Sequence, residues 1–387
     1  MKIYQVGGSV RDALLGLPVS DRDFVVVGAT PEAMIALGYK PVGRDFPVFL
    51  HPESHDEYAL ARTERKHGRG HQGFVFHAQP DVTLEDDLAR RDLTINAMAR
   101  DEAGNLIDPY GGQRDLAART LRHVSPAFGE DPLRVLRVAR FAARFAFDVD
   151  AATMALMTGL VQRGELRDLS GERVWREFSR GLTEAHPSRM LSVLRCCGAL
   201  REIAPELEFL FDCNSPSGQA PLGRSTAGAL DCGARRNPTL IIQYAICSRH
   251  LDIDAATTLA ARLRASIDCR DAAFNAIRYA GTLERAQPLS AAEWLTLLSG
   301  LDALRRPERL QWLLGVVRAY AAAGSVLAED DCAGIAARAN SALGALNAVD
   351  YGNLDNGAGV DVGAQVRARR LSALENWLAG EIRSGTT

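Results

Sequence analysis

Residues 2–12 read KIYQVGGSVRD, and residues 21–28 read DRDFVVVG. The first stretch predicts a short strand, a glycine turn and a helix, with Ser9 as the N-cap of the helix. The apolar run of the second stretch predicts a buried strand. Because side chains two apart on a strand share one face, Asp21 and Asp23 can present two carboxylates together.

These glycines and carboxylates are suited to one kind of chemistry. Carboxylate oxygens are the hard ligands that Mg²⁺ prefers, while Gly8 lets backbone N–H groups approach a triphosphate and Arg11 adds positive charge. An isolated Asp-x-Asp is read first as a solvated strand edge, and a lone Gly-Gly pair is equally weak. Together, the glycine turn, Arg11 and the two carboxylates are groups that could hold a triphosphate with Mg²⁺.

The rest of the chain divides into a mixed region and a long helical remainder. The residues Thr30-Pro31-Glu32 predict the start of a helix that runs to Leu37. Further strands are expected at 48–50, 58–62 and 74–76. Helical patterns cover 84–98, 131–146, 151–163, 172–184 and 188–198. Turn residues predict a linker over 211–238, before a tail rich in Ala and Leu.

We therefore expect an α+β protein of three parts. A small α/β domain covers 1–125, a helical nucleotide-recognition and body domain covers 126–210, and a helical C-terminal domain covers 211–387. A length of 387 residues is ample for two or three domains.

Composition excludes several classes of protein. The chain is 47% hydrophobic and 24% charged, which excludes a disordered chain, and no apolar run approaches the roughly 20 residues of a membrane helix. The N-terminus lacks the pattern of a signal peptide, so we expect a cytoplasmic protein without a membrane partner. We also expect a monomer or a weak homodimer.

The charge of the chain limits how it can meet nucleic acid. The formal net charge is −3, so nucleic acid would need a local basic surface. Only three of the 45 basic residues are lysine, and arginine is well suited to phosphate and base edges. A codon bias toward arginine would give the same count.

A second polar cluster lies in residues 88–99, which read LARRDLTINAMA. A helix there would bury its apolar face and turn Arg91, Asp92 and Asn96 toward a cleft. A surface helix with local pairs explains the same pattern equally well.

A third cluster lies in residues 129–144, which read GEDPLRVLRVARFAAR. A helix that begins near Pro132 places Arg134, Arg137 and Arg140 in one stripe. These charges repel one another unless an anion lies between them; a solvated helix face is the alternative.

Five motifs occur in an order that resembles one family, the class II tRNA nucleotidyltransferases or CCA-adding enzymes, in their proteobacterial form. The motifs are Gly8 with Arg11, Asp21-Arg22-Asp23, RRDLTINA at 90–97, DPYGG at 108–112 and EDPLR at 130–134. The similarity runs densely from residue 1 to about residue 205.

The resemblance implies a polymerase-β-like head domain that adds CCA to the 3′ end of tRNA from CTP and ATP, without a nucleic-acid template. It implies that Asp21 and Asp23 are catalytic and hold two Mg²⁺ ions for an in-line displacement. It places the incoming nucleotide against Gly8, Arg11, Arg91, Arg137 and Arg140, with its ribose near Asp92 and Asn96.

In this family a pair matching Asp131 and Arg134 acts as an amino-acid template for the base. Cytosine and adenine both present an amino donor beside a ring-nitrogen acceptor, so a carboxylate and a guanidinium can read both. Guanine and uracil reverse this pattern and would leave buried polar groups unpaired. The resemblance thus implies a preference for CTP and ATP.

Residues 62–73 read RTERKHGRGHQG and predict a mobile loop. In the family, a flexible element at this place helps the switch from CTP to ATP. His67 and His71 lack a third ligand, so we interpret them as solvated. Glu57 is a weaker candidate for a third acidic group.

The C-terminal part departs from the family. Proteobacterial relatives usually carry an HD-type phosphohydrolase domain, whose metal site needs several histidines. Residues 187–387 contain only His250, and Ile246 and Cys247 stand where the His-Asp dyad is expected. We predict a degenerate helical tail that is retained for packing or for holding the tRNA and that has no hydrolase activity.

Two alternatives to CCA addition stay open. A bacterial poly(A) polymerase shares these motifs but usually carries a strongly basic tail, and incorporation of C would separate the two enzymes. A catalytically silent RNA-binding relative is the other alternative, against which the intact Asp21 and Asp23 argue.

Overall fold

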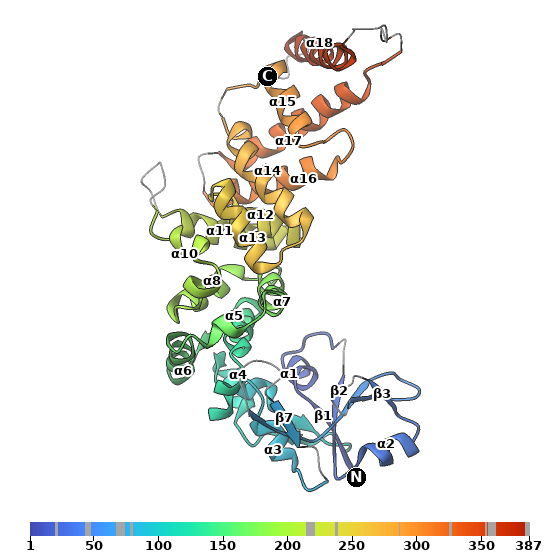
Figure 1. Ribbon diagram of the computed structural model, residues 1–387, viewed down its shortest axis with the longest axis vertical. Helices are drawn as coiled ribbons and strands as arrows, with labels where there is room; N and C mark the ends of the chain where they lie inside the picture. The colour runs from blue at the N-terminus through green and yellow to red at the C-terminus, as the bar shows by residue number, and fades with distance from the viewer. Residues whose placement is uncertain are drawn as a thin grey trace. The chain divides into compact units, whose positions relative to one another are not determined.

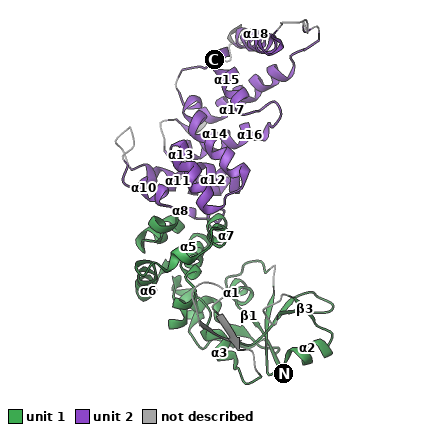
Figure 2. Cartoon of the chain, in the orientation of Figure 1, with its two compact units in different colours: residues 1–181, 189–203 green, residues 182–188, 204–387 purple. Residues whose placement is uncertain are grey.

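The computed structural model describes residues 1–19, 22–42, 48–66, 74–77, 80–213, 221–236, 239–285, 287–324, 327–352, 354 and 361–383. Contacts within the chain divide it into two units (Figure 2). Unit 1 comprises residues 1–181 and 189–203, and unit 2 comprises residues 182–188 and 204–387. The finer division predicted at residue 125 stays a prediction.

A seven-stranded mixed sheet forms the N-terminal part of unit 1 (Figure 1). Its strand order is β3-β4-β5-β2-β1-β8-β9. The strands are β1 (Lys2–Val6), β2 (Asp23–Val27), β3 (Lys40–Val42), β4 (Val48–Leu50), β5 (Glu57–Leu60), β8 (Ala99–Arg100) and β9 (Leu106–Ile107). Within it β2 and β5 are parallel, and the other pairs are antiparallel.

Successive side chains of strand β2 point to opposite faces of the sheet. Both faces are covered by apolar side chains. Val25 packs with Leu84 and Leu88 of α3 (Leu84–Ala89). Val26 packs on the other face with Met34 of α2 (Pro31–Ala36). The apolar run in the sequence therefore predicted the central strand correctly.

The start of the first helix differs from the prediction. Helix α1 (Gly8–Leu14) begins before Ser9, whose hydroxyl donates to the carbonyl of Val6 (3.1 Å) instead of capping the helix. The turn is made by Gly7, which has a φ of 72°. Glycine reaches this conformation without the penalty of a Cβ atom, so the helix is capped at Gly7, two residues before the predicted cap at Ser9.

The helix predicted over 84–98 is wrong beyond Ala89. The Asp92 carboxylate accepts the N–H of Leu93 (2.9 Å), and Leu93 forms an isolated β-bridge with His123. Only a short 3₁₀ helix, η2 (Thr94–Asn96), follows. A pairing with a distant segment has thus overridden the local helical pattern.

The helical body of unit 1 follows the sheet. The predicted helices at 131–146, 151–163, 172–184 and 188–198 are confirmed as α5 (Leu133–Phe145), α6 (Ala151–Gln162), α7 (Gly171–Leu182) and α8 (Pro187–Cys196). The remaining elements are α4 (Gly112–Ala117), α9 (Ala199–Ile203), η3 (Pro126–Glu130), η4 (Glu165–Asp168) and the short parallel pair β10 (Thr120–Leu121) and β11 (Asp148–Val149).

Part of the predicted mobile loop is a strand. Thr63–Lys66 forms β6, which pairs with β7 (Phe74–His77) in an antiparallel ladder. Residues 67–73, including both histidines of this loop, lie outside the described residues.

Unit 2 is helical throughout its described residues. Its helices are α10 (Pro205–Phe209), α11 (Leu222–Arg236), α12 (Leu240–Ser248), α13 (Ile253–Leu263), α14 (Ile267–Leu283), α15 (Ala291–Gly300), α16 (Glu308–Ala322), α17 (Glu329–Asn347) and α18 (Val362–Arg383). No helix among these residues, or among those described in unit 1, has the length and apolar character needed to cross a bilayer.

The linker predicted over 211–238 is wrong for its second half, because α11 occupies Leu222–Arg236. Its glycines permit close packing instead of breaking the helix. A Cβ atom at Gly223 would lie 2.5 Å from the ring of Phe211, and one at Gly233 would lie 2.8 Å from Ile246. Residues 214–220 lie outside the described part of the chain.

Candidate active site

A cleft of about 570 Å³ lies in unit 1 and gathers residues from the sheet, from η2 and from the helical body. Ten of the eleven predicted site residues line it: Gly8, Arg11, Asp23, Arg91, Asp92, Asn96, Asp131, Arg134, Arg137 and Arg140. Asp21 lies outside the described residues. Residues as far apart in the sequence as Gly8 and Arg140 therefore meet at one place, while the role of each residue stays a prediction.

Strand register brings the glycine turn to the start of strand β2. Val6, the last residue of β1, pairs directly with Asp23, the first residue of β2. Gly7 follows at once, and a Cβ atom there would lie 2.7 Å from an Arg91 guanidinium nitrogen. Glycine at this position thus leaves room for Arg91 beside the turn.

Arg11 lines the cleft and is fixed there by an ion pair and a hydrogen bond. Its side chain is 4% exposed and pairs with Asp12 (2.7 Å), and its Nη1 donates to the Asn96 side-chain oxygen. The guanidinium also lies 5.1 Å from the ring centre of Phe141. Burial lowers the pKa of Arg11, and the charge of Asp12 acts against that shift. These contacts keep a fixed positive charge behind the glycine turn.

Asp92 connects two of the predicted motifs. One carboxylate oxygen accepts from the Asn96 amide (2.9 Å), and the other accepts from Arg137 Nε (2.7 Å). Burial alone would raise the pKa of Asp92, but the charge of Arg137 and these hydrogen bonds outweigh it and hold the pKa well below its usual range. The carboxylate is ionised at neutral pH and orients both partners.

The predicted base-reading pair has protein partners of its own. The Asp131 carboxylate accepts from Arg173 Nη2 (3.0 Å) and caps the N–H of Leu133 (3.1 Å). Arg134 donates to the carbonyls of Ala127 (2.8 Å) and Arg90 (2.6 Å). These bonds fix the orientation of both groups at the start of α5, and they identify Arg173 as a positioning residue for Asp131.

A buried ion pair anchors the middle of α5 to α7. Arg140 Nε donates to Glu177 (2.7 Å), and the two side chains are only 9% and 4% exposed. A buried cation that loses its partner is strongly destabilising, because its desolvation is no longer compensated. Glu177 therefore fixes the position of Arg140, one of the arginines that line the cleft.

Replacing Glu177 by alanine is expected to lower the free energy of unfolding by about 3 kcal/mol, because it leaves Arg140 buried without its carboxylate. Urea unfolding followed by circular dichroism measures the change. The control is Glu202→Ala, which breaks the exposed pair with Arg167 and should cost less than about 1 kcal/mol. Equal losses in the two variants would contradict the assignment.

The cleft is strongly cationic. Eight arginines and three aspartates line it among the described residues, an excess of five positive charges in a chain of net charge −3. Phosphate groups are the ligands that arginine forks bind best. The cleft therefore supplies the local basic surface that the overall charge cannot.

Three lining arginines were missed by the sequence analysis: Arg90, Arg144 and Arg180. Arg144 continues the stripe of Arg137 and Arg140 along α5 at helical spacing, so a signal for it was present. It bonds Asp12 through Nη2 (2.9 Å). Arg180 lies on α7, and no pattern near it indicated the cleft.

The donor chemistry of the cleft suits a divalent cation. Asp23 is exposed at its edge, and the parallel pairing of β2 and β5 sets Glu57 directly opposite Asp23. Among the described residues, which do not include Asp21, no group of three or more His, Cys, Asp or Glu side chains could hold a metal ion. Hard oxygen donors beside a cationic cleft are nonetheless the ligand type that Mg²⁺ requires.

Comparison with known proteins decides the family. The chain is 53% identical to the "Multifunctional CCA protein" of Azoarcus sp. (strain BH72) over 337 residues, which cover 81% of this chain and 82% of that protein. The chain belongs to the multifunctional CCA protein family. The protein of that name from Cupriavidus necator is 48% identical over 412 residues, covering 98% of this chain and all of the relative.

Two parts of the chain also match domain families. Residues 3–122 match the "Poly A polymerase head domain", and residues 146–210 match the "Probable RNA and SrmB- binding site of polymerase A". A solved CCA-adding enzyme with CTP superposes with a TM-score of 0.69 at 22% identity, covering 100% of this chain and 92% of that one. An apo form gives 0.71 at 21% identity. The expected fold and family are confirmed.

Proposed function

We propose that this protein adds and repairs the 3′-terminal CCA sequence of tRNA, using CTP and ATP and releasing pyrophosphate. The observation that carries the proposal is the cationic cleft, which joins Asp23, the glycine turn and the Asp131–Arg134 pair in a member of the CCA protein family. The domain match over 146–210, described as an RNA-binding site, supports tRNA as the partner.

The chemistry assigned to the cleft is phosphoryl transfer. The 3′-hydroxyl oxygen of tRNA attacks the α-phosphorus of the nucleotide, its proton is released, and the bond to the β-phosphate oxygen breaks. Arg11, Arg91 and Arg140 hold the triphosphate and neutralise its charge. Two Mg²⁺ ions at Asp21 and Asp23 would supply Lewis-acid charge at the reacting oxygens.

Selection of the base falls to Asp131 and Arg134. The carboxylate accepts from the amino group of cytosine or adenine, and the guanidinium donates to the adjacent ring nitrogen. Arg173, Ala127 and Arg90 hold the pair in place before a nucleotide arrives. Preorganised groups of this kind lose little entropy on binding, which favours discrimination.

The direct test uses a tRNA that lacks its 3′ end. Incubation with CTP, with ATP and with both, followed by sequencing of the 3′ end, should give CC with CTP alone and CCA with both. Repeated addition of A without C would favour a poly(A) polymerase. No incorporation of any nucleotide would favour a catalytically silent RNA-binding relative.

We propose further that unit 2 has no phosphohydrolase activity, although the relatives are named multifunctional. Ile246 and Cys247, at the place of the expected dyad, are fully buried. The buried Tyr320 side chain packs beside them. Its hydroxyl lies 3.1 Å from the carbonyl oxygen of Ile246 and 3.0 Å from the hydroxyl of Thr226. His250 packs edge-on against this ring, and burial lowers its pKa to about 4.

The purified protein is therefore expected to leave 2′,3′-cyclic AMP unhydrolysed in the presence of Mg²⁺, Mn²⁺ or Ni²⁺, at protein concentrations that complete CCA addition. Chromatography of the nucleotide measures this. A metal-dependent loss of the cyclic phosphate that disappears when residues 211–387 are deleted would refute the proposal.

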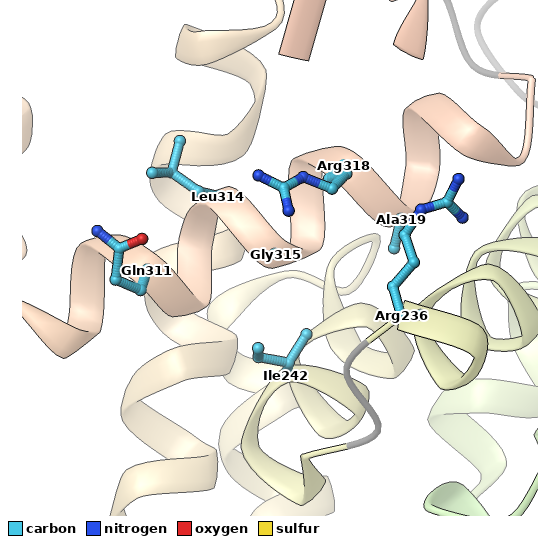
Figure 3. Close-up of a pocket in the computed structure, with 8 residues that line it drawn as sticks. Arg236, Ile242, Gln311, Leu314, Gly315, Arg318 and Ala319 are labelled. Atoms are coloured by element: carbon cyan, nitrogen blue, oxygen red, sulfur yellow. The ribbon is translucent and has the colours of Figure 1, made fainter. Parts of the chain in front are cut away.

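The role we propose for unit 2 is to hold the body of tRNA. A crevice of about 260 Å³ lies between α11, α12 and α16, and Figure 3 shows Ile242 opposite α16 with Arg318 and Arg236 at its rim. Both arginines are exposed. Two exposed guanidinium groups beside an apolar floor suit a backbone phosphate of RNA.

Reversing both charges (Arg236→Glu with Arg318→Glu) is expected to raise KM for full-length tRNA about 10-fold, because two phosphate contacts are lost. The KM for a short acceptor-stem hairpin should not change, because it lacks the tRNA body. The control pair Arg305→Glu with Arg306→Glu makes the same charge change elsewhere in unit 2. Equal effects of the two pairs would show only a general loss of positive charge.

A further inference from the structure

A second hollow of about 460 Å³ adjoins the cleft in unit 1. Its lining is Leu15, Leu17, Pro18, Arg119, Arg144, Phe145 and Phe147. Arg144 lines both the hollow and the cationic cleft. The hollow is therefore a separate compartment at the border of the cationic cleft, and its described lining consists of five apolar side chains and two arginines.

Aromatic rings connect the two compartments. Phe141 lines the cleft and stacks on Phe145 at 6.0 Å between ring centres, and Phe145 lies 5.5 Å from Phe147. Guanidinium groups cover this row: Arg144 lies 5.0 Å from the ring of Phe145, and Arg119 lies 5.6 Å from that of Phe147. The hollow thus combines aromatic walls with two cations.

The backbone that presents these rings adopts an unfavourable conformation. Ala146, which follows the last residue of helix α5, has a φ of 53°, and Arg119 has the same φ. Left-handed backbone at a residue with a Cβ atom costs roughly 1 kcal/mol. The N–H of Asp148 bonds to the carbonyl of Arg119 (3.0 Å) and holds the two segments together. Surroundings that enforce such strain often lie at binding sites.

Two further lining residues, Leu17 and Pro18, precede the predicted catalytic carboxylates in the sequence. Leu17 and Pro18 belong to the segment that joins α1 to Asp21 and Asp23. The Leu17 N–H donates to the carbonyl of Asp12 (2.9 Å), and the Asp12 side chain accepts from Arg144 (2.9 Å). Asp12 therefore connects Leu17 and Arg144, two residues that line the hollow.

We infer that this hollow receives the 3′-terminal base of the tRNA primer, an inference that rests on the proposed function. The end of the primer changes at each step, because the first addition meets one base and the later additions meet the cytosines just added. A site for that end must accept different bases. Apolar and aromatic walls do so because every base has an apolar face, whereas hydrogen-bonding edges would discriminate.

The two arginines of the hollow, Arg119 and Arg144, suit the phosphate groups of a nucleotide. Arg119 is exposed and Arg144 is half-buried, so both can meet the phosphates that flank an inserted base. In the proposed function, the cleft reads base edges through Asp131 and Arg134. Among the described residues that line the hollow there is no such carboxylate–guanidinium pair. The two compartments are therefore assigned to the two substrates of one reaction.

The test combines a protein variant with a modified RNA. Leu17 is 40% exposed, and Arg119 is also exposed, so Leu17→Ala with Arg119→Ala should not disturb folding. We expect KM for a tRNA ending in its first added C to rise about 10-fold, as for the loss of one base-stacking contact, with KM for CTP unchanged. The matched control is Leu37→Ala with Arg114→Ala, which removes an exposed leucine and an exposed arginine elsewhere in unit 1.

The same primer with an abasic 3′-terminal nucleotide gives the second arm. The wild-type enzyme should show a similar KM increase of about 10-fold, and the double variant little further change, because both modifications remove one contact. Full additivity, an unchanged KM for the abasic primer, or an increase in KM for CTP alone would overturn the inference. Absence of incorporation by the wild type would instead refute the proposed function itself, and this inference with it.

Discussion

Replacing Asp23 by alanine is expected to reduce nucleotide incorporation by more than about 10³-fold, because charge developing on the reacting oxygens loses its stabilisation. Asp23 lines the cleft at the first residue of β2, next to the glycine turn. Chelation of divalent ions should stop the wild-type reaction in the same way. Incorporation of labelled CTP into tRNA lacking CCA measures both effects.

Two controls separate this effect from damage to the fold. Glu102→Ala removes an exposed carboxylate from the β8–β9 connection and should leave incorporation unchanged. Binding of tRNA to the Asp23 variant, measured by gel shift, should be close to that of the wild type. Substantial activity in the Asp23 variant would remove this residue from the proposed metal site.

Asp131→Asn is expected to weaken the preference for CTP over UTP by about 10²-fold or more, because the amide can donate to the carbonyl of uracil where the carboxylate cannot. The side chain keeps its size and can still accept from Arg173, which limits the structural change. The ratio of kcat/KM values for CTP and UTP is the measurement.

Arg134→Ala should relax base choice as well as slow the reaction, but it also leaves the carbonyls of Ala127 and Arg90 without their donor. The isosteric change at Asp131 is therefore the sharper test. Glu165→Gln makes the same carboxylate-to-amide change at an ion pair with Arg163 outside the cleft and should not alter the ratio. Unchanged selectivity in the Asp131 variant would remove that residue from base reading.

Local patterns predicted the elements that depend on neighbours in the sequence. The run Phe24–Val27 specifies a buried strand because alternate valines can pack on both faces of a sheet. The amphipathic pattern after Pro132 specifies α5, and Thr30 caps α2 as expected. Each of these signals is carried by fewer than about twenty residues, the range over which periodicity reports structure.

Other features depended on partners far away in the sequence. The helix expected through residue 98 stops because Leu93 pairs with His123, and a helical pattern carries no information about that bridge. The contact of Arg137 with Asp92 spans 45 residues, and that of Arg140 with Glu177 spans 37. Arg180 and the hollow beside Phe147 gave no sequence signal for the same reason.

The amino-acid sequence by itself determined which chemical groups this protein carries, their order along the chain and the family to which the chain belongs. Only the tertiary structure decided which groups face one cleft, which arginines are neutralised by Asp92, Asp131 and Glu177, and where a second compartment opens. The physical reason is that residue type and spacing act locally, whereas burial, ion pairing and cavity shape arise when strands and helices distant in the chain pack together.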